Sequence, residues 1–309
     1  MDPIVTGAVL KAGQFADKVG DSVAKEAGGV LARLFGPSAD VIGQHWADQL
    51  REHNLNRLLK KTERRAEKIA EKGEDPGFAN PRVASQVFES AQYADQEVVA
   101  EYLSGVLTSS RDATGKDDAG VAWSNVVARL SSDQLRLHYA IYASIRPVVL
   151  ADPPERTSEL HARQIVMPTN LLYAACRFTS VESFNDAIDG LLREGLIGDG
   201  YRYGNSTYVW EKLNPGKQIS FPHDHAATFH LSIHGIRLFL WGTGAGRLST
   251  NAYIDSAVTL EPVDASDLPG LVPDVNWKDF YVVDEVAVPT AADVNEDQAE
   301  VVHTPLKRG

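Results

Sequence analysis

The segment TSVESFNDAIDGLLREGLI, residues 179–197, decides how the second half of this chain is interpreted. Its first four residues match a capping box, a pattern that begins a helix by satisfying the first free amides. Apolar residues then recur at helical spacing, namely Phe184, Ile188, Leu191 and Leu192. Gly195 follows at a position where many helices end in a left-handed residue. The segment therefore predicts a capped, amphipathic helix with one buried face.

Around this helix the pattern includes both helical and β-like stretches. A short helix is expected before it, at residues 167–178. After it, residues 201–203 and 207–210 alternate on either side of a Gly204-Asn205 turn, which predicts a small β-hairpin. Residues 229–233 alternate like a half-buried strand, and the chain then resumes as a helix.

Helix, helix, capped helix and β-ribbon in this order are typical of a winged helix-turn-helix, here with enlarged loops at 151–166 and 211–226. The helix in the recognition position is acidic, because Glu182, Asp186, Asp189 and Glu194 outnumber Arg193. DNA phosphates would be repelled by such a face. The pattern thus favours a packing or protein-interaction module over a DNA reader.

The first half of the chain predicts helices. The longest pattern covers residues 38–72, where apolar positions alternate by four and three like a short coiled-coil seam. The seam consists of Leu55, Leu59, Thr62, Ala66 and Ile69. Further helices are expected over residues 81–93, 95–108 and 120–130, and from Ser131 to a break at 147–154.

One basic stretch lies in the longest helix. Residues 51–72 hold eight basic and four acidic side chains, a net charge of +4. The candidate interaction residues on it are Arg57, Lys60, Lys61, Arg64 and Arg65. Contact with nucleic acid or anionic lipid is one interpretation. A solvated helix face that docks the acidic tail is the interpretation that the interspersed glutamates favour.

Small residues recur every four positions in a helix expected over residues 4–35. They include Ala12, Ala16, Gly20, Ala24 and Gly28. Such spacing lets another helix approach closely, but the stripe drifts by about 40° at each step, since a helix turns about 100° per residue. Packing on the same chain, self-association and docking on a membrane surface all stay open.

The net charge of −12 is unevenly distributed along the 309 residues. Residues 251–309 hold 12 acidic and 3 basic side chains, a net charge of −9. The rest of the chain is close to neutral, which disfavours sequence-independent binding of nucleic acid. Beyond Pro289 the composition predicts disorder.

Cys176 is the only cysteine, so an intramolecular disulfide is excluded and a reducing compartment is expected. The chain starts without the basic and apolar regions of a secretory signal. No stretch reaches the roughly 18 uncharged apolar residues of a transmembrane helix. The expected location is the bacterial cytoplasm, with the periphery of the inner membrane as the alternative.

Two clusters of residues are candidates for chemistry. His223, His225, His230 and His234 form the densest set of potential metal ligands, but their spacing matches no standard zinc site. Residues 242–246 (GTGAG) follow a helix, whereas a phosphate-binding loop precedes one, so they are interpreted as a flexible exit from the domain. No serine or cysteine is placed beside a base as a nucleophile. We therefore predict no catalytic residue, no metal and no cofactor.

The expected fold is mainly α. It comprises an amphipathic helix at residues 1–35, a helical domain at 36–130, a winged-helix-like α+β domain at 131–248 and an acidic extension at 249–309. Cys176 is expected in the core of the third segment.

Residues 36–43 (GPSADVIG) and 46–51 (WADQLR) resemble the opening signature of the Abi-alpha family, which is associated with bacterial defence against phage. The similarity continues through the basic helix, residues 94–103 (ADQEVVAEYL) and 123–134, and the segments 191–197 and 231–235. It covers roughly residues 30–245.

That family has no established catalytic residues, so the resemblance implies a non-enzymatic role in abortive infection. Such a protein would act through self-association or by binding a protein partner. The alternatives are a membrane-acting effector that uses the N-terminal helix and a winged-helix regulator that binds DNA.

Overall fold

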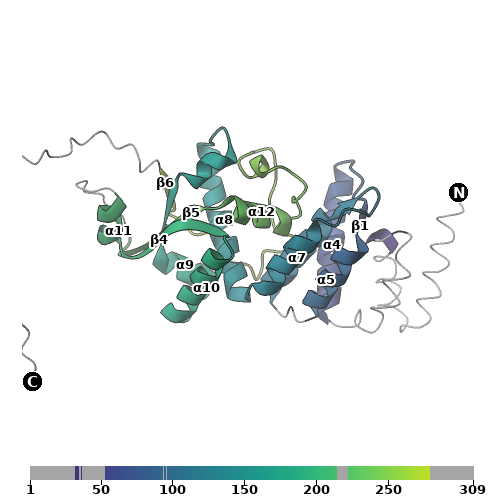
Figure 1. Cartoon of the computed structure of the whole chain (residues 1–309), viewed down its shortest axis with the longest axis horizontal. Coiled ribbons are helices and arrows are strands. Elements are labelled where there is room, and N and C mark those ends of the chain that lie inside the picture. Colours follow the sequence, from purple (N-terminus) through teal and green to yellow (C-terminus); the bar gives the residue numbers. More distant parts are fainter. Residues whose placement is uncertain are drawn as a thin grey trace, which may run out of the picture. The chain divides into compact units, whose positions relative to one another are not determined.

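The structure, a computed structural model, describes residues 32–34, 36, 53–92, 94, 96–213 and 222–278 (Figure 1). They belong to the first of two compact units, which ends at Lys278. This part is mostly helical with small antiparallel sheets, which confirms the mainly α class. The small-residue stripe from Ala12 to Gly28 and the acidic segment beyond Lys278 lie outside the described residues.

The first half is built from helices α4 (His53–Glu71), α5 (Pro81–Ala91), α6 (Glu97–Ser109) and α7 (Gly120–Arg129). Their existence confirms the helical prediction for this half. Helix α5 begins where Asn80 accepts a hydrogen bond from the Arg82 amide and Pro81 supplies the first turn. Two short strands, β1 (Phe78–Ala79) and β2 (Arg111–Asp112), pair antiparallel. Helix α6 is buried on nearly all sides, so it forms the centre of this half.

Helix α8 (Ser132–Ala151) starts as predicted, with a capping box between Ser131 and Gln134. The expected break at Pro147 is wrong, because the helix continues through it. A proline inside a helix costs about 3 kcal/mol. Here Pro147 is exposed, while Ile145 and Val149 on either side stay fully buried. Burial of that apolar face offsets the lost hydrogen bond.

A four-stranded antiparallel sheet has the order β4-β5-β3-β6. Its strands are β3 (Gln164–Pro168), β4 (Ile197–Asn205), β5 (His225–Leu231) and β6 (Asn276–Lys278). Strand β3 occupies a stretch expected as loop and the start of a helix, so helix α9 (Thr169–Cys176) begins two residues later than predicted. All five residues of β3 are buried, which removes the alternation by which a strand is recognised.

The predicted hairpin around Gly204-Asn205 is also wrong. Strand β4 runs through both residues and pairs with β5, matching Arg202 to Thr228 and Gly204 to Ala226. Helix α11 (Ser206–Leu213) follows directly. The Asn205 side chain accepts a hydrogen bond from the Thr207 amide at 3.0 Å, so this asparagine starts a helix instead of forming a turn.

Helices α10 (Val181–Arg193) and α12 (Ile233–Gly242) confirm the expected helices. The cap of α10 is Ser180, whose hydroxyl accepts from the Ser183 amide, one residue later than predicted. Gly195 has φ +64, and the Leu196 amide returns to the Leu191 carbonyl at 2.8 Å, which closes the helix. Cys176 lies in the core as expected, and burial raises the pKa of its thiol to about 12.

One hydrophobic core runs through the described residues from Leu34 to Val272. This core includes residues on both sides of the expected domain boundary at residues 130 and 131. The division into a helical and a winged-helix-like domain therefore stays a prediction. The segment after α12 contains a 3-10 helix at Thr250–Tyr253, as the loop after α8 does at Thr157–His161. Tyr253, Leu260 and Leu268 anchor this segment to the core.

Candidate functional site

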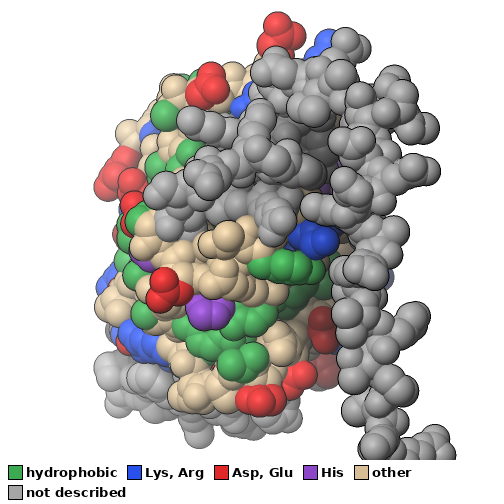
Figure 2. Space-filling model, turned by 90° about the vertical axis from the view of Figure 1, so that its left-hand side faces the viewer, with side chains coloured by type: hydrophobic (Ala, Val, Ile, Leu, Met, Phe, Trp, Pro, Cys, Tyr) green, Lys and Arg blue, Asp and Glu red, His purple; other side chains and the backbone are tan. Residues whose placement is uncertain are grey.

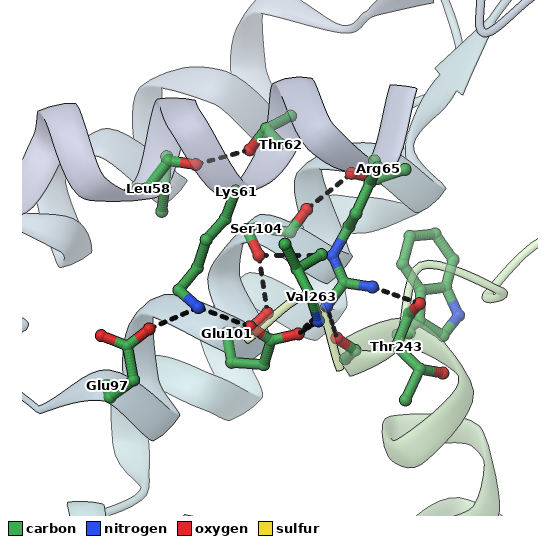
Figure 3. Close-up of polar contacts among 12 residues, drawn as sticks. Leu58, Lys61, Thr62, Arg65, Glu97, Glu101, Ser104, Thr243 and Val263 are labelled. Carbon is green, nitrogen blue, oxygen red and sulfur yellow. Dashed lines mark hydrogen bonds and ion pairs between the residues drawn. The ribbon is translucent and has the colours of Figure 1, made fainter. Parts of the chain in front are cut away.

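Helices α4 and α6 bring together a row of opposite charges (Figure 3). Arg57, Lys61 and Arg65 follow one another at one-turn intervals on α4, and Glu97 and Glu101 do so on α6. The Lys61 Nζ lies 2.9 Å from Glu101 Oε2 and also pairs with Glu97. Arg57 reaches Glu97 at 3.4 Å, and Arg65 pairs with Glu101. Cations further along α4 pair with carboxylates further along α6, so the one-turn spacing on one helix matches the one-turn spacing on the other.

These charges are buried. Lys61 is 3% exposed, Arg65 5% and Glu101 2%. Charges removed from water are tolerated only when partners and hydrogen bonds replace the lost solvation. Glu101 meets this condition, because it accepts from Lys61, from Arg65 and from the Val263 amide at 2.7 Å. The cluster thereby joins three parts of the chain that are distant in sequence.

Arg65 extends the network to the end of helix α12. Its guanidinium donates to the carbonyls of Gly242, at 3.2 Å, and of Thr243. These carbonyls lie where the helix leaves acceptors unpaired and where a positive charge is favourable. Burial lowers the pKa of Arg65, and the neighbouring Glu101 opposes that shift.

The glycine-rich segment 242–246 is closely packed, so its interpretation as a flexible exit is wrong. A Cβ placed on Gly105 of α6 would lie 1.9 Å from the Gly242 carbonyl oxygen. A Cβ on Gly242 would lie 2.6 Å from the Tyr102 ring, and one on Gly246 would lie 2.4 Å from the Trp241 ring. The glycines allow α6 and α12 to approach backbone to backbone, and this approach brings the α12 carbonyls within reach of Arg65.

The structure separates the five basic residues that the sequence singled out on α4. Arg57, Lys61 and Arg65 point into the ion cluster, which corrects their placement on a solvated face. Lys60 and Arg64 are exposed. Charge counting along the helix could not divide them, because the partners Glu97 and Glu101 lie about 40 residues further on.

Beside the cluster lies a cleft of about 240 Å³. Its lining consists of Asn56, Arg57, Lys60, Lys61, Arg64, Glu97 and Asp264. A second cleft of about 340 Å³ lies further along α4, between that helix and the loop before β1. The first is rich in charge, and the second is mainly apolar.

The four histidines considered as metal ligands lie in different surroundings. His223 Nε2 is 3.0 Å from Asp274 Oδ2. His225 stacks on the Tyr203 ring, and His234 lies against Trp123. His230 packs against β4. Within the described ranges, no group of three or more His, Cys, Asp or Glu side chains is arranged to hold a metal ion.

His138 was not singled out by the sequence, yet it is the most strongly perturbed histidine that the structure describes. It is fully buried; its Nδ1 lies 2.5 Å from the Tyr102 hydroxyl and its Nε2 3.1 Å from the Gly235 carbonyl. Burial lowers its pKa to about 3. The neutral ring donates from Nε2 to the carbonyl and accepts the Tyr102 proton at Nδ1. The only sequence signal was its position within a strongly apolar helix.

This histidine predicts a specific pH dependence of stability. The folded-state pKa of about 3 lies below the ordinary value of 6.5, so between these values the unfolded chain binds a proton that the folded chain does not. Stability is full above pH 6.5 and falls as the pH drops toward 3. From pH 7.5 to 5.0 we expect wild type to lose about 2 kcal/mol more than His138→Gln, measured by urea unfolding. Equal losses in the two proteins would contradict this assignment.

No protein-family model matches this chain, and neither a curated protein nor a solved structure matches it. The fold and the charged cluster are therefore argued from the residues of this chain. Most of the Abi-alpha-like opening signature, residues 37–51, lies outside the described residues. No helix in the described part is long and apolar enough to cross a membrane.

Proposed function

We propose that this chain is a non-catalytic phage-defence protein that acts by binding protein, either a second copy or a partner, through a winged-helix-like module. The observation that carries the binding mode is the set of exposed side chains on β4 and on the two helices that contact it, α10 and α11. Three large apolar side chains are among them: Val181, Tyr203 and Tyr208. We call them, together with the acidic side chains of α10, the wing face.

A winged-helix layout is supported by the order of elements. Helix α8, strand β3, helices α9 and α10 and strands β4 and β5 occur in this order, with a 3-10 helix inserted before β3 and helix α11 inserted before β5, and β5 lies between β4 and β3 in the sheet. Three helices and three antiparallel strands in this order are typical of a winged helix-turn-helix, to which this chain adds helix α11 and the edge strand β6. Helix α10 then takes the recognition position, and β4 with β5 forms the wing.

The exposed side of α10 is poorly suited to DNA. Its solvent-facing residues include Glu182, Asp186 and Asp189, against the single cation Arg193. Glu194 beyond the helix pairs with Arg129 at 2.8 Å. Because DNA affinity depends on neutralising phosphates, an acidic helix at this position works against it. The DNA-binding regulator is therefore the less favoured alternative.

The wing face is well suited to protein. Val181 is 45% exposed and Tyr208 53%. The Tyr203 ring links them to the core, since it lies 6.0 Å from the Phe184 ring and stacks on His225. Figure 2 views the molecule from the side of α11 and β4, where apolar side chains gather around a histidine. Exposed tyrosines and aliphatic residues with a polar rim are typical of protein interfaces.

The defence role rests on the resemblance to the Abi-alpha signature, and a phage-plaque assay tests both parts of the proposal. Bacteria that express the chain are expected to reduce plaque formation. Val181→Ser with Tyr208→Ser is expected to cut this protection about tenfold or more, because it removes the exposed anchors without opening the core. The matched control is Leu248→Ser with Leu271→Ser, which changes two exposed leucines that belong to none of α10, β4 and α11.

Two results would contradict the proposal. If the chain gives no protection against any phage of a broad panel, the defence role fails. If protection depends equally on the wing face and on the control leucines, the wing face has no special part in it. A low-salt gel shift that detects DNA binding with a steep salt dependence would favour the DNA-binding alternative instead.

A further inference from the structure

We propose that the cleft beside the ion cluster is a binding site for a small phosphorylated ligand. The cleft lies along α4 at the level of Lys60 and Arg64, and Glu97 of α6 and Asp264 complete its lining. Its volume of about 240 Å³ is below the roughly 300 Å³ at which sites for drug-sized molecules begin. A ligand of one or two phosphoryl groups matches this size. The wing face has no part in this site.

The charge of the cleft is positive. Four cations line it, Arg57, Lys60, Lys61 and Arg64, against the two carboxylates Glu97 and Asp264. Glu97 is already engaged, since it pairs with both Arg57 and Lys61. Lys60 and Arg64 make no hydrogen bond or ion pair with any residue that the structure describes. Two cations therefore line the cleft without an ion pair to a carboxylate in the described part of the chain.

The buried cluster keeps these cations in place. Lys60 and Arg64 lie next to Lys61 and Arg65, whose ion pairs fix the rotation of α4 about its axis. Because the helix cannot turn, the one-turn spacing of Lys60 and Arg64 is preserved along the cleft. Because the helix backbone is already fixed, only the side chains of Lys60 and Arg64 lose conformational freedom when they bind an anion.

A phosphoryl group is the ligand chemistry that these residues recognise best. It carries close to two negative charges and three acceptor oxygens, and a guanidinium can donate two parallel hydrogen bonds to it while lysine supplies a point charge. A nucleic-acid backbone is a poorer fit, because the basic row on α4 is interrupted by the exposed Glu67 and Glu71.

Asp264 is expected to weaken anion binding at the cleft, whereas Lys60 and Arg64 are expected to strengthen it. Its carboxylate accepts from the Ser266 amide at 3.0 Å, and this bond, with the nearby Lys61 and Arg64, lowers its pKa. It therefore stays ionised in the lining of the cleft and competes with an incoming anion. The preceding residue is held independently by the Val263 amide bond to Glu101. Removing the Asp264 charge is thus expected to strengthen binding while the backbone stays in position.

The test is isothermal titration calorimetry of the full chain with pyrophosphate and with inorganic phosphate in about 50 mM salt, where surface charges are weakly screened. Lys60→Gln with Arg64→Gln is expected to weaken pyrophosphate binding about tenfold or more. Asp264→Asn is expected to tighten it about threefold. The control Lys68→Gln with Lys72→Gln removes two exposed cations that do not line the cleft, and it should leave binding unchanged.

The outcomes are distinct. Pyrophosphate binding that is absent from wild type, or that survives Lys60→Gln with Arg64→Gln, overturns the proposal. Equal weakening by the control pair also overturns it, since net charge alone would then explain the binding. Flotation with phosphatidate vesicles separates the sources of the ligand. If vesicle binding also depends on Lys60 and Arg64, the phosphoryl group belongs to a lipid headgroup; pyrophosphate binding without vesicle binding assigns it to a soluble compound.

Discussion

Replacing Glu101 with Gln is expected to lower the free energy of unfolding by about 3–5 kcal/mol. The change keeps the shape of the side chain but removes the one charge that Lys61 and Arg65 share. Both cations are almost fully buried, so water cannot take the place of the carboxylate. Among the described residues, Arg65 would then lack its only carboxylate partner, and Lys61 would keep Glu97 alone.

Urea unfolding followed by tryptophan fluorescence measures this loss. Glu67→Gln is the matched control, because Glu67 lies on the same helix α4 but is exposed. A change within about 0.5 kcal/mol is expected for it, as for surface substitutions in general. If Glu101→Gln costs no more than the control, the cluster is not desolvated and the account of the α4–α6 interface fails.

Replacing Gly105 with Ala is expected to destabilise the protein by about 1–3 kcal/mol, the usual cost of overpacking. The sign is informative, since Gly to Ala in the interior of a helix ordinarily stabilises by about 1 kcal/mol. Here the added methyl would lie 1.9 Å from the Gly242 carbonyl oxygen. Because the obstacle is backbone, no side-chain rotation can relieve it, and α12 must move away from α6.

The control for this substitution is Gly270→Ala. Nothing lies within 4 Å of a Cβ placed on Gly270, so its stability should be nearly unchanged. Thermal unfolding of the two variants beside wild type makes the comparison. A Gly105→Ala protein that melts at or above the wild-type temperature would show that α6 and α12 are not in close contact.

Several elements followed from local sequence because their causes are local. Helix α8 begins at Ser131 since that serine and Gln134 satisfy each other's backbone amides. Helix α10 carries its apolar residues at helical spacing and ends at Gly195. Periodicity, caps and terminal glycines act within a few residues, so they can be recognised without knowing what the helix packs against.

The charged site was recognised only in part. The sequence draws attention to five basic residues on α4. Arg57, Lys60, Lys61 and Arg64 line the cleft, and Arg65 belongs to the buried ion cluster beside it. The sequence could not tell which of the five are buried, because Glu97 and Glu101 belong to another helix. Asp264 and Val263 were unforeseen, since they come from the segment after α12.

The sequence by itself determined the presence of most helices, the burial of Cys176 and the acidic surface of α10. Only the tertiary structure decided the strands and the roles of the charges. Strand β3 is buried on both faces and loses its alternation, while β4 depends on β5 across a long connection. The same holds for Lys60 and Lys61, which are neighbours in sequence. Lys61 is buried in ion pairs with carboxylates of α6, whereas Lys60 is exposed. Strand pairing and burial depend on residues that are distant in the chain, so a local sequence pattern cannot predict them.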